Sequence, residues 1–166
     1  MTTNSHVPTR EIIRLGVLAG VAGGFAEVFW IWIYGVLSGI DAGLIARGIS
    51  EAIGAGDTVA PLALGIVIHM ILAVALGVVL VIALCPIFAH LGGIPGMYAS
   101  MTLILMAVWA VNFLVVLPQI SPTFVHLVPY QVSLLSKVLF GFAAAAVLGV
   151  SPRHADTFSA PRTSAT

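Results

Sequence analysis

The sequence has little charge and almost no cysteine. Of its 166 residues 7% are charged, and six Lys or Arg balance six Asp or Glu. Soluble domains carry about 25% charged residues, so this chain cannot cover a water-facing surface of ordinary polarity. Without a basic excess it has no surface that would attract nucleic acid. The single cysteine, Cys85, excludes an internal disulfide and a cysteine-based metal site within one chain.

Signatures of common enzymes are also lacking. There is no Gly-x-Ser-x-Gly nucleophile motif, no His-Glu-x-x-His zinc motif and no phosphate-binding Gly-Lys-Ser loop. Many of the 17 glycines lie in apolar stretches, where glycine lets two helices approach closely. We therefore expect a protein that is not an enzyme and uses no cofactor.

Long apolar runs make up most of the chain, in which 60% of the residues are apolar and the mean hydropathy is +1.16. Four runs are each long enough to cross about 30 Å of hydrocarbon as a helix. They are residues 12–38, 61–85, 96–117 and 129–150. The first is longer than the apolar part of a secretory signal, about 7–15 residues, and is predicted to remain as a span.

Prolines mark the borders of the last three runs, as helix-end chemistry favours. The sequence therefore predicts an all-α protein, an integral membrane four-helix transmembrane bundle that forms one domain over residues 10–150. Residues 1–9 and 151–166 are polar tails, and the second is expected to be disordered. By hydropathy and proline placement the chain resembles small four-helix bacterial inner-membrane proteins, a resemblance that implies no activity.

Residues 39–60, between the first two runs, hold a third of the charged side chains. Asp41 can cap a helix over residues 41–54, because its carboxylate accepts free backbone N–H groups. Four apolar residues would form one side of this helix: Ile40, Leu44, Ile49 and Ile53. Arg47, Ser50 and Glu51 would form the other side. The pattern predicts a short amphipathic helix in the membrane interface after the first span.

The basic residues near the span ends predict the orientation. Four arginines lie on the side of the termini, and only Arg47 lies on the other. The four are Arg10, Arg14, Arg153 and Arg162. Because cytoplasmic flanks carry the excess of Lys and Arg, we expect a multi-pass protein of the cell (inner) membrane with both termini in the cytoplasm. Residues 39–60 and 119–128 then face outward.

Each run contains one strongly polar residue: Glu27, His69, Asn112 or Lys137. Counted from the outer ends of the runs, their depths are roughly 16, 12, 9 and 12 Å, so all four lie in or near one leaflet. A lone charge there would be costly. Glu27 and Lys137 are therefore predicted to form an ion pair, with His69 and Asn112 completing the hydrogen bonding.

The helical faces agree with this grouping. Glu27 continues a stripe of glycines spaced three or four residues apart, which another helix can approach. These glycines are Gly16, Gly20 and Gly23. Three aromatic residues extend the faces of Glu27 and Asn112 and are assigned to the rim of a pocket: Trp30, Tyr34 and Trp109.

Two interpretations of the polar layer remain open. It forms a pocket, open to the outer face, in which a small ligand or ion binds or permeates, or it only holds four helices in register. The alternative function is a non-catalytic accessory or scaffold subunit of a larger membrane complex. The partners are then the lipid bilayer and either a membrane protein or further copies of the chain. Glycine stripes turned inward would favour a self-contained bundle, and one turned to lipid would favour a partner.

Two metal interpretations are weaker. A bis-histidine haem needs two ring nitrogens facing one cavity, and only His69 and His126 come near this arrangement. Met97, Met101 and Met106 could offer thioethers to Cu(I), but Met106 is out of register and methionine commonly fills apolar helix faces. We expect no metal site.

Overall fold

A computed structural model of the chain describes residues 8–84 and 93–150, which are helical apart from short turns. Within this part of the chain, four helical segments are long and apolar enough to cross a membrane. They are α1 (Thr9–Ser38), α3 (Pro61–Leu84), the continuous segment of α4, η2 and α5 (Gly93–Ile120), and α7 (Tyr130–Val150). The predicted all-α membrane bundle is confirmed.

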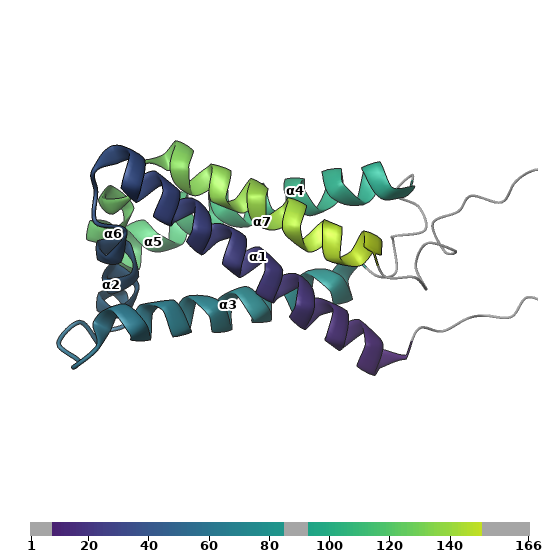
Figure 1. Ribbon diagram of the computed structural model, residues 1–166, viewed down its shortest axis with the longest axis horizontal. Helices are drawn as coiled ribbons and strands as arrows, with labels where there is room; N and C mark the ends of the chain where they lie inside the picture. Colours follow the sequence, from purple (N-terminus) through teal and green to yellow (C-terminus); the bar gives the residue numbers. More distant parts are fainter. Residues whose placement is uncertain (1–7, 85–92, 151–166) are drawn as a thin grey trace, which may run out of the picture.

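The four long segments run along the length of the molecule (Figure 1). α1 packs against both α3 and α7, and α4 packs against α7. Two short helices, α2 (Ala42–Ala52) and α6 (Pro122–Leu127), lie at one end of the bundle, opposite the start of α1 and the end of α7. Both described chain ends therefore lie at the same end of the molecule.

The glycine stripe of α1 faces its neighbours, as predicted. A Cβ at Gly20 would lie 2.6 Å from the Ala73 carbonyl oxygen, and one at Gly16 would lie 2.6 Å from the Val78 Cα. The next member of the stripe, Gly23, meets the Phe140 ring of α7 at the same distance. These contacts leave no room for a side chain, so α1 packs against the backbone of α3 on one side and against the Phe140 ring of α7 on another.

An apolar core fills the half of the bundle away from α2 and α6. It joins the first half of α1 and much of α4 to the second halves of α3 and α7. Several of its large side chains are almost completely buried: Leu84, Met97, Met101, Leu105 and Phe140. This core is the floor on which the polar layer rests.

The helix predicted after the first span is present as α2, and Asp41 caps it by accepting a 2.8 Å hydrogen bond from the Gly43 N–H. One residue departs from the predicted faces. Ser50, expected on the polar side, is buried and donates to the Pro61 carbonyl at 2.6 Å. The cause is contact with α3, because the Ala46 backbone packs directly against a glycine there, Gly65.

The third span was predicted to end at Leu117, before Pro118, but it continues past this point. The chain forms a π-helical turn, η2 (Asn112–Val116), and then continues as α5 (Leu117–Ile120). Proline lacks an N–H group and its ring crowds the preceding turn, and a widened turn accommodates both effects without ending the helix. Residues 122–127, predicted as part of an outer loop, form α6.

Some predictions fall outside the described residues. These concern Cys85, Pro86, Arg153, Arg162 and the tail over residues 151–166. At the other end, Thr9 is not part of a polar tail but the first residue of α1.

Candidate functional site

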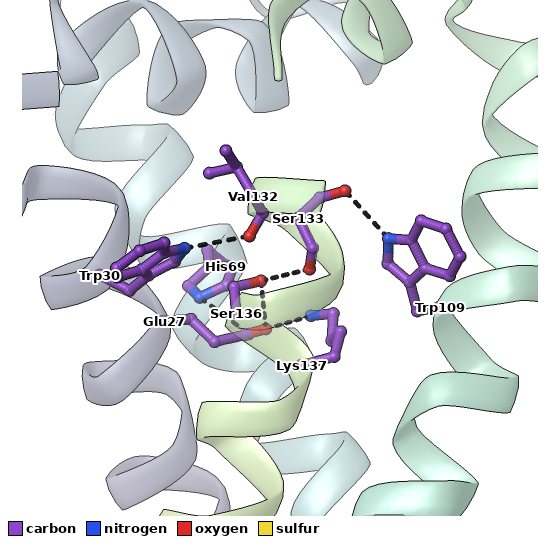
Figure 2. A network of polar contacts seen from close by, with 8 residues as sticks. All are labelled: Glu27, Trp30, His69, Trp109, Val132, Ser133, Ser136 and Lys137. Carbon is purple, nitrogen blue, oxygen red and sulfur yellow. Dashed lines mark hydrogen bonds and ion pairs between the residues drawn. The ribbon is translucent and has the colours of Figure 1, made fainter. Parts of the chain in front are cut away.

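Glu27 is the centre of the polar layer. Its position on the glycine stripe of α1 turns the carboxylate into the bundle, where the residue is 3% exposed. Lys137 of α7 reaches it with an Nζ–Oε1 distance of 2.6 Å, and Ser136 Oγ lies 3.2 Å from the same oxygen. Figure 2 shows these side chains converging between α1 and α7. The predicted Glu27–Lys137 ion pair is therefore present in the fold.

His69 of α3 approaches the other carboxylate oxygen. Its Nε2 lies 3.6 Å from Glu27 Oε2, beyond ordinary hydrogen-bond distance. Nε2 is buried, and no group in the described part of the chain forms a hydrogen bond with it. Lys137 also faces an aromatic ring. Its ammonium lies 6.0 Å from the centre of the Phe140 ring, which is the outer limit of a cation–π contact.

The charges of this cluster cancel. The Glu27 carboxylate and the Lys137 ammonium form a close pair of opposite charge. A buried pair is tolerated when its remaining hydrogen-bonding capacity is satisfied, and loss of one partner leaves an uncompensated charge. The site therefore presents polar groups to its surroundings without a net charge.

Two tryptophans hold the start of α7 in place beside the cluster. Trp30 of α1 donates from Nε1 to the Val132 carbonyl at 3.0 Å, and Trp109 of α4 donates from Nε1 to Ser133 Oγ at 2.9 Å (Figure 2). Ser133 Oγ in turn donates to the Tyr130 carbonyl at 3.0 Å. These bonds fix the turn of α7 that precedes Lys137.

A cavity of about 640 Å³ adjoins the cluster. The four residues singled out in the sequence, one from each span, all line it: Glu27, His69, Asn112 and Lys137. The aromatic residues assigned to its rim do not. Trp30 and Trp109 serve as anchors of α7 instead, and Tyr34 is outside the lining.

Asn112 contributes to the cavity from a different wall. It opens the π-helical turn η2, and none of the hydrogen bonds in residues 8–84 and 93–150 joins it to the Glu27 cluster. The sequence placed Asn112 at the right depth. It gave no sign of the π turn, which frequently marks functional sites.

Sequence reasoning missed two groups of lining residues. Ser133 and Ser136 were not assigned to the pocket, although both lie within one turn of Lys137 on α7. The other group is apolar and comes from α2 and its C-cap: Ile45, Ile49 and Ile53. Ile49 and Ile53 were predicted on the apolar side of an interfacial helix, and the sequence pattern of that helix does not show its contact with α3.

At the outer end of the cavity α2 and α6 pack directly on each other, where a Cβ at Gly48 would lie 2.7 Å from Leu127 Cδ1 and 2.9 Å from the Phe124 ring. Val128 and Phe124 of this region line the cavity from above. Apolar side chains of α2 and α6 therefore lie at this end of the cavity, and the opening to the outer face stays a prediction.

The metal interpretations gain nothing from the geometry. No three His, Cys, Asp or Glu in the described residues are grouped so as to hold a metal ion. His126 is exposed on α6 and does not line the cavity with His69. Met97 and Met101 are fully buried in the apolar core, where packing accounts for them.

Comparison with protein-family models, curated proteins and solved structures finds no match for this chain.

Proposed function

We propose that this membrane protein binds a small, largely apolar molecule in the cavity, with the polar cluster fixing one end of the ligand. The observation that carries the proposal is a cavity of about 640 Å³ on which polar groups from all four spans converge. Ligand sites are concave, mostly apolar and equipped with a few placed polar groups, and in helical bundles they lie between the helices. The proposed role is non-catalytic.

Unsatisfied polar groups support a ligand over a purely structural network. A network that only held the helices in register would be expected to use its buried hydrogen-bonding groups internally. Here Glu27 and Lys137 pair with each other, while His69 Nε2 is buried without a hydrogen bond to the described residues and Asn112 lines the cavity apart from the cluster. The Asn112 amide is therefore available to a bound molecule.

The apolar floor supports binding over permeation. An ion that crossed the bundle would have to pass from the polar layer through the core that contains Met101, Leu105 and Phe140, each 0% exposed. The buried side chains of this core are apolar and cannot replace a hydration shell, as an ion pathway requires. A cavity with a closed floor instead suits a molecule that enters and leaves by the same route.

The glycine faces support a self-contained bundle over an accessory subunit. Glycines of α1, α3 and α7 are buried against other helices of the same chain: Gly16, Gly20, Gly23, Gly24, Gly65, Gly77 and Gly141. A small-residue stripe facing lipid would instead have pointed to a second protein. We place the protein in the cell membrane with both termini in the cytoplasm, in line with its arginines.

The proposal is tested by purification in mild detergent with mass spectrometry of small molecules that co-elute. Lys137→Met removes the cation of the cluster, and Asn112→Leu removes a lining amide without disturbing the ion pair. Arg47→Met is the matched control, because Arg47 pairs with Asp41 at the surface. We expect a molecule to co-elute with wild type and Arg47→Met and to be depleted from folded Asn112→Leu and Lys137→Met. A protein partner recovered equally with all four would contradict the proposal and favour the accessory subunit.

A further inference from the structure

We infer that the ligand is an uncharged amphipathic molecule with an oxygen acceptor in its head, and that it enters sideways from the bilayer between α3 and α4. This inference rests on the proposed binding function and adds the ligand class and the route.

The first step concerns how α3 is held. One side of this helix packs against α1, where Ala73 and Gly77 contact the glycine stripe. Residues on another side line the cavity, among them Ile68, Leu72 and Leu76. Leu72 is 61% exposed and also belongs to the lining, so the cavity wall continues into the lipid-facing surface of α3.

The second step concerns the facing helix. α4 packs against α7, where Gly141 meets Thr102 and Leu105. Val108 and Asn112 line the cavity from this segment, and Val111, between them, is 58% exposed. α3 thus packs against α1, and α4 packs against α7. The cavity lies between these two pairs of helices.

This gap is bounded at both ends. Below it, Leu80 and Leu84 of α3 join Met97 and Met101 of α4 in the apolar core. Above it, α2 and α6 cover the cavity with apolar side chains. A water-borne ion would have to lose its hydration shell to pass this cover, whereas a molecule dissolved in the bilayer meets apolar side chains throughout the lateral route.

The third step concerns the head of the ligand. Glu27 and Lys137 already neutralise each other at 2.6 Å, so an added charge would lie in the membrane interior without a counter-charge. Lys137 has three N–H donors and uses one on Glu27 Oε1, so it keeps donors for an oxygen of the ligand. The Asn112 amide, which also lines the cavity, offers an N–H donor and a carbonyl acceptor. An uncharged carbonyl or hydroxyl oxygen suits this arrangement better than an ammonium or a carboxylate.

The head class is tested with probes that share a twelve-carbon tail, applied to the full chain in phosphatidylcholine nanodiscs, with empty nanodiscs subtracted. The probes are tritiated methyl dodecanoate, dodecanoate and dodecyltrimethylammonium. We expect the ester to bind at least about tenfold more tightly than either ion at equal membrane concentration. Tighter binding of dodecanoate or of the quaternary amine would overturn the uncharged head and leave the cavity's binding role intact. No binding of any probe would remove both the proposed function and this inference.

The route is tested on two adjacent residues of α3. Leu72 lines the cavity and is 61% exposed, while Ile71 is 62% exposed and lies outside the lining. In Leu72→Trp the indole narrows the gap, and we expect exchange of bound ester against unlabelled ester to slow by about tenfold. Ile71→Trp should exchange at the wild-type rate. Equal rates in both variants and wild type, or equal slowing in both variants, would overturn lateral entry.

Discussion

Lys137 Nζ lies 2.6 Å from Glu27 Oε1 inside the bundle, where the two side chains are 17% and 4% exposed. Arg47 Nη2 lies 2.9 Å from Asp41 Oδ2 at the surface, where the side chains are 42% and 57% exposed. The two pairs have nearly the same length. Loss of the buried pair should lower the free energy of unfolding far more than loss of the surface pair, because water solvates the remaining charge only at the surface.

Lys137→Met is therefore expected to lower the free energy of unfolding by about 3–5 kcal/mol, since it leaves the Glu27 carboxylate buried without its cation. Arg47→Met should cost about 1 kcal/mol or less. Thermal unfolding in detergent measures both. The double variant Glu27→Gln with Lys137→Met should recover much of the loss, because no charge then remains. A double variant as unstable as Lys137→Met would show that the cost comes from packing rather than charge.

Gly77→Ala tests the contact between α1 and α3. A Cβ at Gly77 would lie 2.5 Å from the Gly16 carbonyl oxygen and 2.5 Å from the Gly20 Cα, and backbone cannot move aside as a side chain can. We expect a loss of about 1–3 kcal/mol by overpacking, seen as a lower unfolding temperature. Gly149→Ala is the control, because its nearest neighbour, Met97 Cε, would lie at an ordinary 3.6 Å. That variant should be neutral or slightly more stable, since alanine favours helix.

The sequence allowed the spans, the glycine contacts and the central ion pair to be predicted, because each depends on a period along one helix. Glu27 follows Gly23 by one turn, so both must face the same neighbours. Depth counting then placed Lys137 at the same level without knowledge of how the helices are arranged. The ion pair between Glu27 and Lys137 then followed, since a lone charge in the membrane interior needs a partner.

Features that depend on contact between elements could not be predicted in this way. Ser50 of α2 is buried because Pro61 offers it a carbonyl, a contact that the amphipathic pattern of α2 does not contain. The π turn at Asn112 depends on how the chain accommodates Pro118 without leaving the bundle. The cover over the cavity likewise results from α2 meeting α6, two segments far apart in the sequence.

The proposed orientation is tested by cysteine labelling in a Cys85→Ser background. Asp57→Cys lies in the exposed turn before α3, and Arg10→Cys lies at the exposed start of α1, at the opposite end of the bundle. With both termini in the cytoplasm, a membrane-impermeant maleimide added to intact cells should label Asp57→Cys alone. Permeabilised cells should show labelling of both. Labelling of Arg10→Cys alone in intact cells would reverse the orientation.

Asn112→Leu separates a binding role for the polar layer from a structural one. Asn112 lines the cavity, yet within the described residues it shares no hydrogen bond with Glu27, His69 or Lys137. Leucine has a similar size and suits an apolar cavity wall, so the unfolding temperature should change little, corresponding to about 0.5 kcal/mol or less.

Ligand binding should respond differently to the same change. Loss of one hydrogen bond to the head of the ligand is expected to weaken the affinity for methyl dodecanoate by about two- to tenfold, since such a bond contributes roughly 0.5–1.5 kcal/mol. Val111→Leu is the control, because Val111 is exposed on the same helix and does not line the cavity. A stable Asn112→Leu variant with unchanged affinity would remove Asn112 from the site. A strongly destabilised variant would instead mean that the amide supports the bundle, and the structural interpretation of the polar layer would then be the better one.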